Sequence, residues 1–294
     1  MIEAIALAHV FAPAARPVIP YGETGTGKTF FAEYIHQLSG RPDGFHTFSV
    51  GTMAPQLVFD ELFGHVEGAY TDARRVRAGR IVTAGRGTLL LDDFQNLDLA
   101  GQKPLVQVLD RGTYSPVGSD RVAVATCRFI LAMSDAPDVL MRQGVLLKDL
   151  RYRFGGCAIW MPPLRERRLE IPIHAQRALE RCPEETKLEG PTRFTDAALA
   201  VLCESEFPGN VRELRGVVEY GFLMARAAGA DRIGREHLPR DLTAALRYER
   251  RGNREVNRRV VEQTLRITGG NVSEAARLLG TSRQTVAALR SMPM

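Results

Sequence analysis

The chain has 294 residues, enough for one medium domain and a smaller one, and its 45% apolar and 25% charged residues are ordinary for a soluble globular protein. No long apolar run and no basic-apolar-small leader pattern is present, so the sequence predicts neither a membrane span nor a signal peptide. The four cysteines fit no metal motif and no disulfide framework, which indicates reduced thiols in a cytoplasmic protein.

The net charge of +5 is unevenly distributed along the chain. Residues 240–294 contain eleven arginines, no lysine and five acidic residues, a charge of +6, so the rest of the chain carries about −1. A basic tail on a nearly neutral body is typical of a module that binds a polyanion. A solvated basic face has the same composition, and charge alone leaves both interpretations open.

The first half of the chain alternates short apolar strands with helical patterns, as an α/β sheet requires. The apolar residues 18–19 lead into a glycine-rich turn, and the 3.6-residue spacing of apolar side chains predicts a helix over 30–38. Residues 88–91 are predicted to form a strand that ends in two acids, and 129–133 to form another strand. We therefore expect a nucleotide-binding α/β subdomain over 1–164.

Helical patterns dominate after the Pro162-Pro163 pair, and they predict helices over 173–181, 196–205 and 211–227. We expect these helices to form a second subdomain over 165–242. The arginine-rich polar stretch 248–259 is expected to join it to a small all-helical domain, so that 243–294 is a linker and a DNA-binding module.

A phosphate-binding motif occupies residues 22–29, which read GETGTGKT and match G-x-x-x-x-G-K-[ST] in full. The predicted strand before it and the helix after it are the required context. Backbone amides can turn toward the phosphates, Lys28 can reach the β- and γ-phosphates, and the Thr29 hydroxyl can bind Mg²⁺. A plain Gly/Thr turn is the weaker alternative. The expected ATP-binding residues are Gly22, Glu23, Thr24, Gly25, Thr26, Gly27, Lys28 and Thr29.

Two acidic residues, Asp92 and Asp93, follow the predicted strand 88–91. Carboxylates at the C-terminal end of a parallel strand face the crevice where ligands bind. Asp92 is expected to hold Mg²⁺ together with Thr29, and Asp93 to polarise the attacking water. Without the phosphate motif, an acidic cap at the end of a strand would be the better interpretation.

Seven segments of the chain resemble the bacterial enhancer-binding proteins, the AAA+ activators of sigma-54 RNA polymerase. They are GETGTGKT (22–29), ELFGHVEGAYTDA (61–73), GTLLLDD (87–93), DLRYRF (149–154), PPLRERRLEIP (162–172), FPGNVREL (207–214) and GGNVSEAARLLGTSRQTV (269–286). The resemblance covers nearly the whole chain and keeps the order of the motifs. It implies an AAA+ P-loop NTPase with a three-layer αβα domain, a helical lid and a C-terminal helix-turn-helix.

The resemblance assigns roles to three further sites. The loop that grips sigma-54 in the family corresponds to Gly68, Ala69, Tyr70, Thr71, Asp72 and Ala73. Local packing of Tyr70 is the alternative for that loop. Arg153 matches the arginine finger that acts on ATP in the neighbouring subunit of a ring, a hexamer in the family. Arg212 matches the lid arginine that senses nucleotide, and a salt bridge on a helix surface is its alternative.

The spacing over residues 271–290 fits a helix-turn-helix, and the resemblance is to the Fis-type domain of the family. Gly280 lies at the turn, Ser282 can cap the second helix, and such modules bind paired half-sites as dimers. A dimerisation hairpin is the alternative. The residues expected to contact DNA are Ser282, Arg283, Gln284, Thr285 and Arg290.

The chain departs from the family pattern within its chemistry. Asp93 stands where the family has Glu, Ser49 where it has the switch asparagine, and Asp72 where the loop has Gly. Met133-Ser134 replaces a Thr-Asn pair and Leu147 replaces a first arginine, whereas Thr29 replaces an acid and favours Mg²⁺ binding. A catalytic group misplaced by an ångström can lower a rate about a hundredfold.

Only 21 residues precede Gly22, so we expect no receiver or ligand-sensing domain in this chain. Control would then come from the expression level, from a partner protein or from a start upstream of Met1. Three functions remain open: an ATP-driven sigma-54 activator, a catalytically weak DNA-binding regulator or mixed-ring subunit assembled by nucleotide, and a metabolic P-loop kinase. The kinase explains neither the loop at 68–73 nor the basic C-terminal module.

Overall fold

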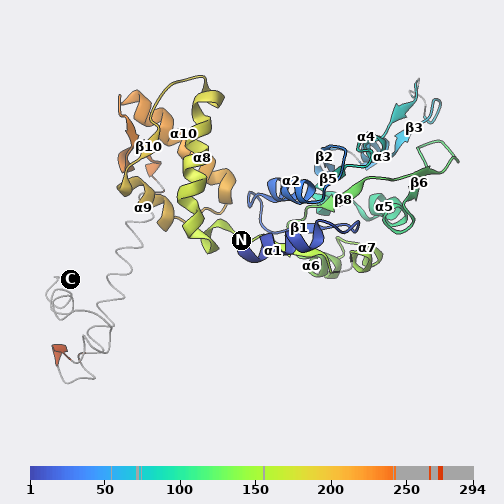
Figure 1. Cartoon of the computed structure of the whole chain (residues 1–294), viewed down its shortest axis with the longest axis horizontal. Coiled ribbons are helices and arrows are strands. Elements are labelled where there is room, and N and C mark those ends of the chain that lie inside the picture. The colour runs from blue at the N-terminus through green and yellow to red at the C-terminus, as the bar shows by residue number, and fades with distance from the viewer. Residues whose placement is uncertain are drawn as a thin grey trace. The chain divides into compact units, whose positions relative to one another are not determined.

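The computed structural model describes residues 1–53, 55–70, 73, 75–154, 156–240, 242, 265 and 271–273. Its helices and strands are α1 (Ile2–Phe11), β1 (Ile19–Tyr21), α2 (Lys28–Leu38), β2 (Phe45–Ser49), α3 (Pro55–Phe63), β3 (Gly64–His65), β4 (Arg77–Ala78), α4 (Arg80–Thr83), β5 (Thr88–Asp92), α5 (Leu99–Arg111), β6 (Thr113–Tyr114), β7 (Ala123–Val124), β8 (Arg128–Leu131), α6 (Pro137–Arg142), α7 (Lys148–Arg153), β9 (Ala158–Trp160), α8 (Ile171–Thr186), β10 (Arg193–Phe194), α9 (Asp196–Glu204), α10 (Asn210–Ala227) and β11 (Arg232–Ile233) (Figure 1). None of the helices within these ranges is long and apolar enough to cross a membrane.

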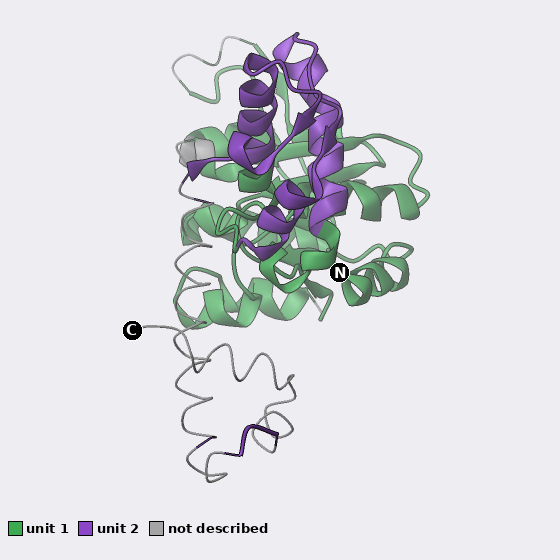
Figure 2. Cartoon of the chain, turned by 90° about the vertical axis from the view of Figure 1, so that its left-hand side faces the viewer, with its two compact units in different colours: residues 1–170, 206–214 green, residues 171–205, 215–294 purple. Residues whose placement is uncertain are grey.

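Two compact units make up the chain, and Figure 2 colours them separately. The first contains residues 1–170 and 206–214, and the second contains 171–205 and the described residues from 215 onward. The sequence predicts a boundary between residues 164 and 165 and places 206–214 in the second subdomain, whereas in this division 206–214 group with the first unit. The cause is local, because the Val211 amide donates a hydrogen bond of 3.0 Å to the Gly25 carbonyl in the phosphate loop.

The first unit is built on a parallel sheet. β5 lies between β2 and β8, and β1 pairs with β9, all in parallel register. Parallel bridges from Val18 to Ile130 and from Tyr21 to Met133 connect β1 to β8. This gives the order β2-β5-β8-β1-β9 and confirms the expected α/β fold. The predicted strand 88–91 is β5, whose pairing continues through Asp92, and the predicted strand 129–133 corresponds to β8.

Helices cover both faces of this sheet, because successive strand side chains point in opposite directions. Leu90 and Ile130 pack in a core with residues of α1 and α2. Leu89 and Leu91 pack in a second core with residues of α3, α5 and α7. A strand buried on both faces reads as a continuous apolar run, which explains the sequence of β5. Because the strands of this sheet are all parallel, their carboxyl ends lie at one edge.

Helix α1 was not predicted from the sequence, and a buried arginine explains how it is fixed. The Arg128 guanidinium at the start of β8 donates hydrogen bonds to the carbonyls of Phe11 and Ala12 (2.6 Å each) and Arg16 (3.2 Å). Carbonyls at the end of a helix lack intrahelical partners, so this guanidinium caps α1. Burial lowers the pKa of Arg128 to about 10, which leaves it charged at neutral pH.

The second unit is helical, as the sequence predicts. The helices predicted over 173–181, 196–205 and 211–227 are α8, α9 and α10, and α8 is longer than expected. The first residues of α10, 210–214, belong to the first unit. Ala175, Leu179 and Cys182 form the buried stripe of α8. The Thr195 hydroxyl caps α9 by accepting a hydrogen bond of 3.2 Å from the Ala198 amide, and β10 pairs with β11 in parallel.

Candidate nucleotide site

The phosphate loop lies between β1 and α2, at the carboxyl edge of the sheet. Gly22, Gly25 and Gly27 adopt φ values of +147°, +80° and +99°, which side-chain-bearing residues rarely adopt. A Cβ atom at Gly25 would also overlap the carbonyl of Gly209. The glycines therefore permit the chain to turn tightly just before the N-terminus of α2, and a glycine-rich loop at a helix N-terminus is an anion-binding arrangement.

Lys28 begins α2 and turns back over the loop. Its side chain donates to the carbonyls of Gly22 (2.7 Å) and Glu23 (3.1 Å), and the residue is only 8% exposed. Burial lowers the pKa of Lys28, and the charges of Asp92 and Asp93 oppose that shift. The ammonium therefore lies against the carbonyls of the loop itself, and the charges of Asp92 and Asp93 act on it.

Thr29 and Asp92 come together across the edge of the sheet. The Thr29 hydroxyl donates a hydrogen bond of 3.0 Å to Asp92 Oδ2, although the two residues are 63 positions apart. A hydroxyl beside a carboxylate is the oxygen donor set that Mg²⁺ takes in nucleotide sites. The residues present therefore fit a magnesium-bound nucleotide.

Asp93 and Ser49 flank this pair. Asp93 adopts a left-handed backbone (φ +54°), and its amide donates a hydrogen bond of 3.0 Å to Asp92 Oδ1. Ser49 ends β2 directly opposite Asp92 in the strand register. Met133, the residue at the sensor position, is fully buried, and its amide donates to the Pro20 carbonyl (3.1 Å). Ser49, Asp92, Asp93 and Met133 thus lie at the same end of the sheet.

Glu23 directs its carboxylate toward Arg165. The guanidinium of Arg165 binds both carboxylate oxygens (2.6 and 2.8 Å), and Asn210 donates a further hydrogen bond of 3.1 Å. These hydrogen bonds, that of Arg165 foremost, lower the pKa of Glu23 to about 2. Glu23 therefore contributes to the phosphate loop through its backbone, while its side chain is an anchor.

Asn210 was read from the sequence only as the start of a helix. It is fully buried, with φ +54°. Its Oδ1 accepts from the Leu164 amide (2.7 Å), and its Nδ2 donates to Glu23 and to the Thr24 carbonyl (3.0 Å). The signal that could have revealed it is the Gly209-Asn210 pair, because asparagine tolerates a left-handed backbone better than most residues.

Arg212 lies two residues further on, in the first turn of α10. A Cβ atom at Gly25 would come within 3.2 Å of Arg212 Cβ, and the Arg212 charge is one of those that lower the pKa of Lys28. The structure thus brings Arg212 to the loop.

Thr26 is held within the loop by both its side chain and its backbone. Its hydroxyl donates to the Glu23 carbonyl (2.8 Å), and its carbonyl accepts from the buried Arg167 (2.7 Å).

Arg153 contacts residues outside the phosphate loop. It ends α7, and its guanidinium forms an ion pair of 2.9 Å with Asp110 near the end of α5. The same side chain is 3.5 Å from the Asp149 carbonyl. Those contacts do not connect it to the nucleotide site of its own chain.

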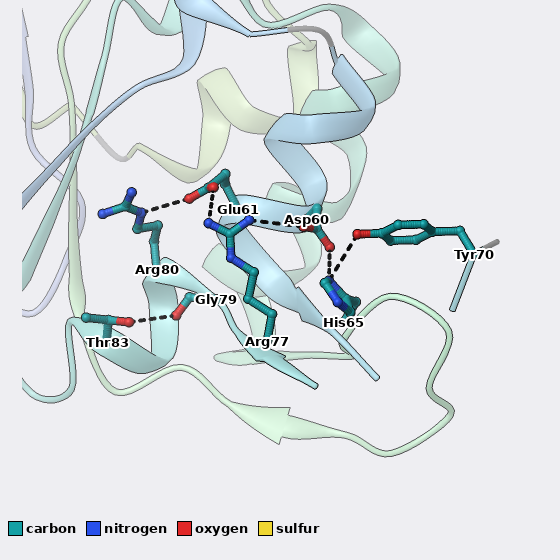
Figure 3. A network of polar contacts seen from close by, with 8 residues as sticks. All are labelled: Asp60, Glu61, His65, Tyr70, Arg77, Gly79, Arg80 and Thr83. Atoms are coloured by element: carbon teal, nitrogen blue, oxygen red, sulfur yellow. Dashed lines mark hydrogen bonds and ion pairs between the residues drawn. The ribbon is translucent and has the colours of Figure 1, made fainter. Parts of the chain in front are cut away.

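The loop after β3 is anchored by a polar network (Figure 3). His65 pairs with Asp60, both buried, and Arg77 pairs with Glu61. Tyr70 is 48% exposed and points toward His65, with ring centroids 5.2 Å apart. It therefore packs on one side and stays accessible on the other.

The backbone of this loop turns tightly, since the Gly68 amide donates to the Ala73 carbonyl (2.8 Å) and the Ala73 amide to that of Tyr70 (2.9 Å). Ala69 lies within the turn, and its amide donates to the Val66 carbonyl (3.2 Å). Two predicted loop residues, Thr71 and Asp72, lie outside the described residues. The predicted DNA contacts Ser282, Arg283, Gln284, Thr285 and Arg290 also lie outside them.

Comparison with known protein families matches three consecutive parts of the chain. Residues 1–160 match the sigma-54 interaction domain, 165–255 the AAA+ ATPase lid domain, and 253–288 the Fis family of bacterial regulatory proteins. The Nif-specific regulatory protein of Rhizobium meliloti is 37% identical over 228 residues, which are 77% of this chain and 42% of that protein. The regulatory protein ZraR of Salmonella typhimurium is 33% identical over 285 residues, 94% of this chain and 63% of that protein.

A crystal structure of NtrX from Brucella abortus in complex with ATP superposes with a TM-score of 0.72 at 24% identity, and covers 98% of this chain and 66% of that one. This likeness confirms the AAA+ fold. The chain spans less than two thirds of the length of the Nif regulator and ZraR. From the match over residues 1–160, followed by the lid and the Fis-type region, the chain belongs to the sigma-54-dependent transcriptional activators, with an AAA+ domain and a DNA-binding helix-turn-helix.

Proposed function

We propose that this chain binds and hydrolyses ATP with Mg²⁺ in an oligomeric ring, and that hydrolysis drives remodelling of sigma-54 RNA polymerase at promoters. The observation that carries the proposal is the convergence of Lys28, Thr29 and Asp92 at the carboxyl edge of the sheet. The ATP complex of the NtrX structure, which shares the fold, supports the choice of nucleotide. We propose a hexamer, in the cytoplasm, on the precedent of the family.

The binding residues divide by role. The amides of residues 22–27 would cradle the phosphates, Lys28 would contact the β- and γ-phosphates, and Thr29 with Asp92 would hold Mg²⁺. The metal would neutralise charge on the phosphates. Arg212 would sense the bound nucleotide, since its side chain starts beside Gly25.

Hydrolysis requires a polarised water and a cation at the γ-phosphate. Asp93 would orient the water, with Ser49 beside Asp92 on the neighbouring strand. Arg153 would act on the ATP of the adjacent subunit, which agrees with its contacts away from the loop of its own chain. Its charge would stabilise the transition state.

The segment from Gly68 to Ala73 would engage the sigma factor. Its described base is held by the buried pair of His65 and Asp60, while Tyr70 remains about half exposed. An exposed aromatic on a firmly anchored turn provides a contact that moves with the body of the unit. The Fis-type region would hold the ring at an upstream DNA site.

The steady-state ATPase rate of the purified chain tests the proposal. We expect Mg²⁺-dependent turnover that Lys28→Ala and Arg153→Ala each abolish. Arg151→Ala is the matched control, because Arg151 lies on the same helix, pairs with Asp138 (2.6 Å) and is not the residue expected to act as the arginine finger. A wild-type rate no higher than that of Lys28→Ala would refute hydrolysis.

The DNA assignment has its own test. We expect Arg283→Ala to weaken binding of an operator fragment about tenfold and to leave ATP binding unchanged, since one base-edge contact contributes about 1–3 kcal/mol. Unchanged operator affinity would contradict the helix assignment.

A second candidate is a catalytically weak regulator, or a subunit of a mixed ring with a paralogue, in which nucleotide controls assembly without sigma-54 contact. Two features favour it. Asp93 has a shorter side chain than the glutamate of the family and lies on a left-handed backbone, and Ser49 lies opposite Asp92 where the family has asparagine. Nucleotide binding and assembly without turnover would select it. Promoters that lack −24/−12 elements would also select it.

A further inference from the structure

Helix α7 ends in two arginines that are held in unlike ways. Arg151 binds Asp138 of α6 through two nitrogens, at 2.6 and 2.8 Å. Arg153 binds Asp110 of α5 through one nitrogen, at 2.9 Å. A two-point guanidinium–carboxylate pair is stronger and more specific than a one-point pair. Arg153 is therefore the more weakly held of two neighbouring guanidinium groups.

The rest of the Arg153 guanidinium is poorly satisfied. Its Nη1 is 3.5 Å from the Asp149 carbonyl, at the limit of a hydrogen bond, and its Nε is buried without a partner in the part of the chain that the structure describes. A buried donor without a partner destabilises the conformer that contains it. The observed position is a resting place that the side chain can leave readily.

Asp110 also depends on this contact. It lies near the C-terminal end of α5, where the helix dipole disfavours a negative charge, and the Arg153 hydrogen bond holds its pKa below the ordinary value. The two side chains are 47% and 31% exposed, so the pair is screened by solvent. Tyr152 beside it is 65% exposed, which leaves this end of α7 open to a second copy of the chain.

We propose that Asp110 is the resting partner of Arg153, and that it exchanges with the phosphates of ATP in the neighbouring subunit when the ring assembles. This inference rests on the proposed function. A carboxylate with one negative charge competes with a triphosphate with several, so exchange is favourable only once the neighbour is in place. Asp110 thereby competes with the contact between subunits and raises the protein concentration at which turnover begins.

The test is ATPase turnover per subunit as a function of protein concentration at saturating MgATP. The variant Asp110→Asn keeps the shape of the side chain and removes its charge. We expect its half-maximal concentration to fall about two- to fivefold, the range of an exposed ion pair. The matched control Asp138→Asn, which frees Arg151 instead, should keep the wild-type midpoint. Adding Arg153→Ala to Asp110→Asn should abolish turnover.

Sedimentation at the same concentrations with MgATP should show the same shift in assembly, and thermal melts of each variant confirm folding. A midpoint for Asp110→Asn equal to or above that of the wild type overturns the inference, and so does a rate as low as that of Arg153→Ala. In either case the proposed function stands as long as the wild type turns over ATP. A wild type without turnover at any concentration overturns both, so the two failures are distinguishable.

Discussion

Replacing Asn210 by alanine should weaken both the folded state of the first unit and its hold on nucleotide. The substitution leaves the buried Leu164 amide without an acceptor and removes the amide that binds Glu23 and the Thr24 carbonyl. It also places alanine on a backbone with φ +54°. An unsatisfied buried donor, a lost charge-assisted bond and a left-handed alanine together should lower the free energy of unfolding by about 3–5 kcal/mol.

The single tryptophan, Trp160 on β9, makes the assay specific, because its fluorescence reports unfolding of the first unit. Urea unfolding followed at Trp160 gives the change in free energy. Asn210→Gly separates the two causes, since glycine accepts the left-handed backbone and should recover about 1 kcal/mol relative to alanine. The nucleotide dissociation constant should rise about tenfold with Asn210→Ala, because the loop is no longer preorganised.

Gln102 provides a matched control for this prediction. It is also a fully buried amide, with hydrogen bonds to the Leu97 and Val145 carbonyls and from the Leu147 amide, but it lies on α5. Gln102→Ala should therefore destabilise the unit and leave nucleotide affinity unchanged. A loss of less than about 0.5 kcal/mol for Asn210→Ala, or equal weakening of nucleotide binding by both variants, would refute the reasoning.

Three further changes test other parts of the first unit. The pKa of Glu23 is about 2 when folded against 4.5 otherwise, so its pair with Arg165 stabilises the fold above pH 4.5 and loses that contribution as the pH falls toward 2. Because the pair is partly exposed, Glu23→Gln should remove about 1 kcal/mol of this pH dependence, measured by Trp160 fluorescence. Thr29→Ala should weaken Mg²⁺-dependent nucleotide binding about tenfold in calorimetric titrations, and Thr29→Ser should restore it. Arg128→Leu leaves the carbonyls at the end of α1 uncapped and should lower the free energy of unfolding by about 2–4 kcal/mol in urea, with wild-type nucleotide affinity at low denaturant.

The parts of the fold that follow from local sequence could be predicted. The strand 88–91 is a threonine and three leucines between a glycine and two acids, and the phosphate loop is defined by the spacing of its own glycines and Lys28. Such signals need no knowledge of distant residues. The same holds for the helices of the second unit, whose apolar stripes recur at helical spacing.

The contacts that assemble the site could not be predicted, because they join residues far apart in the chain. Arg165 meets Glu23 across 142 positions, and Asn210 meets it across 187. The capping of α1 by Arg128 spans 117 positions at Phe11. In each case the polar residue looks from the sequence like any exposed arginine or turn asparagine, and only the packed sheet brings it to its partner.

Asn210 also explains why the first turn of α10 belongs with the phosphate loop. Its two polar atoms are satisfied at once by Leu164 on one side and Thr24 on the other. A hydrogen bond weakens steeply once its atoms separate beyond about 3.5 Å, so a displacement of the loop by an ångström breaks at least one of these bonds unless the three segments move together. Arg212 is therefore carried with the loop, and any shift of the loop on nucleotide binding reaches the start of α10 directly.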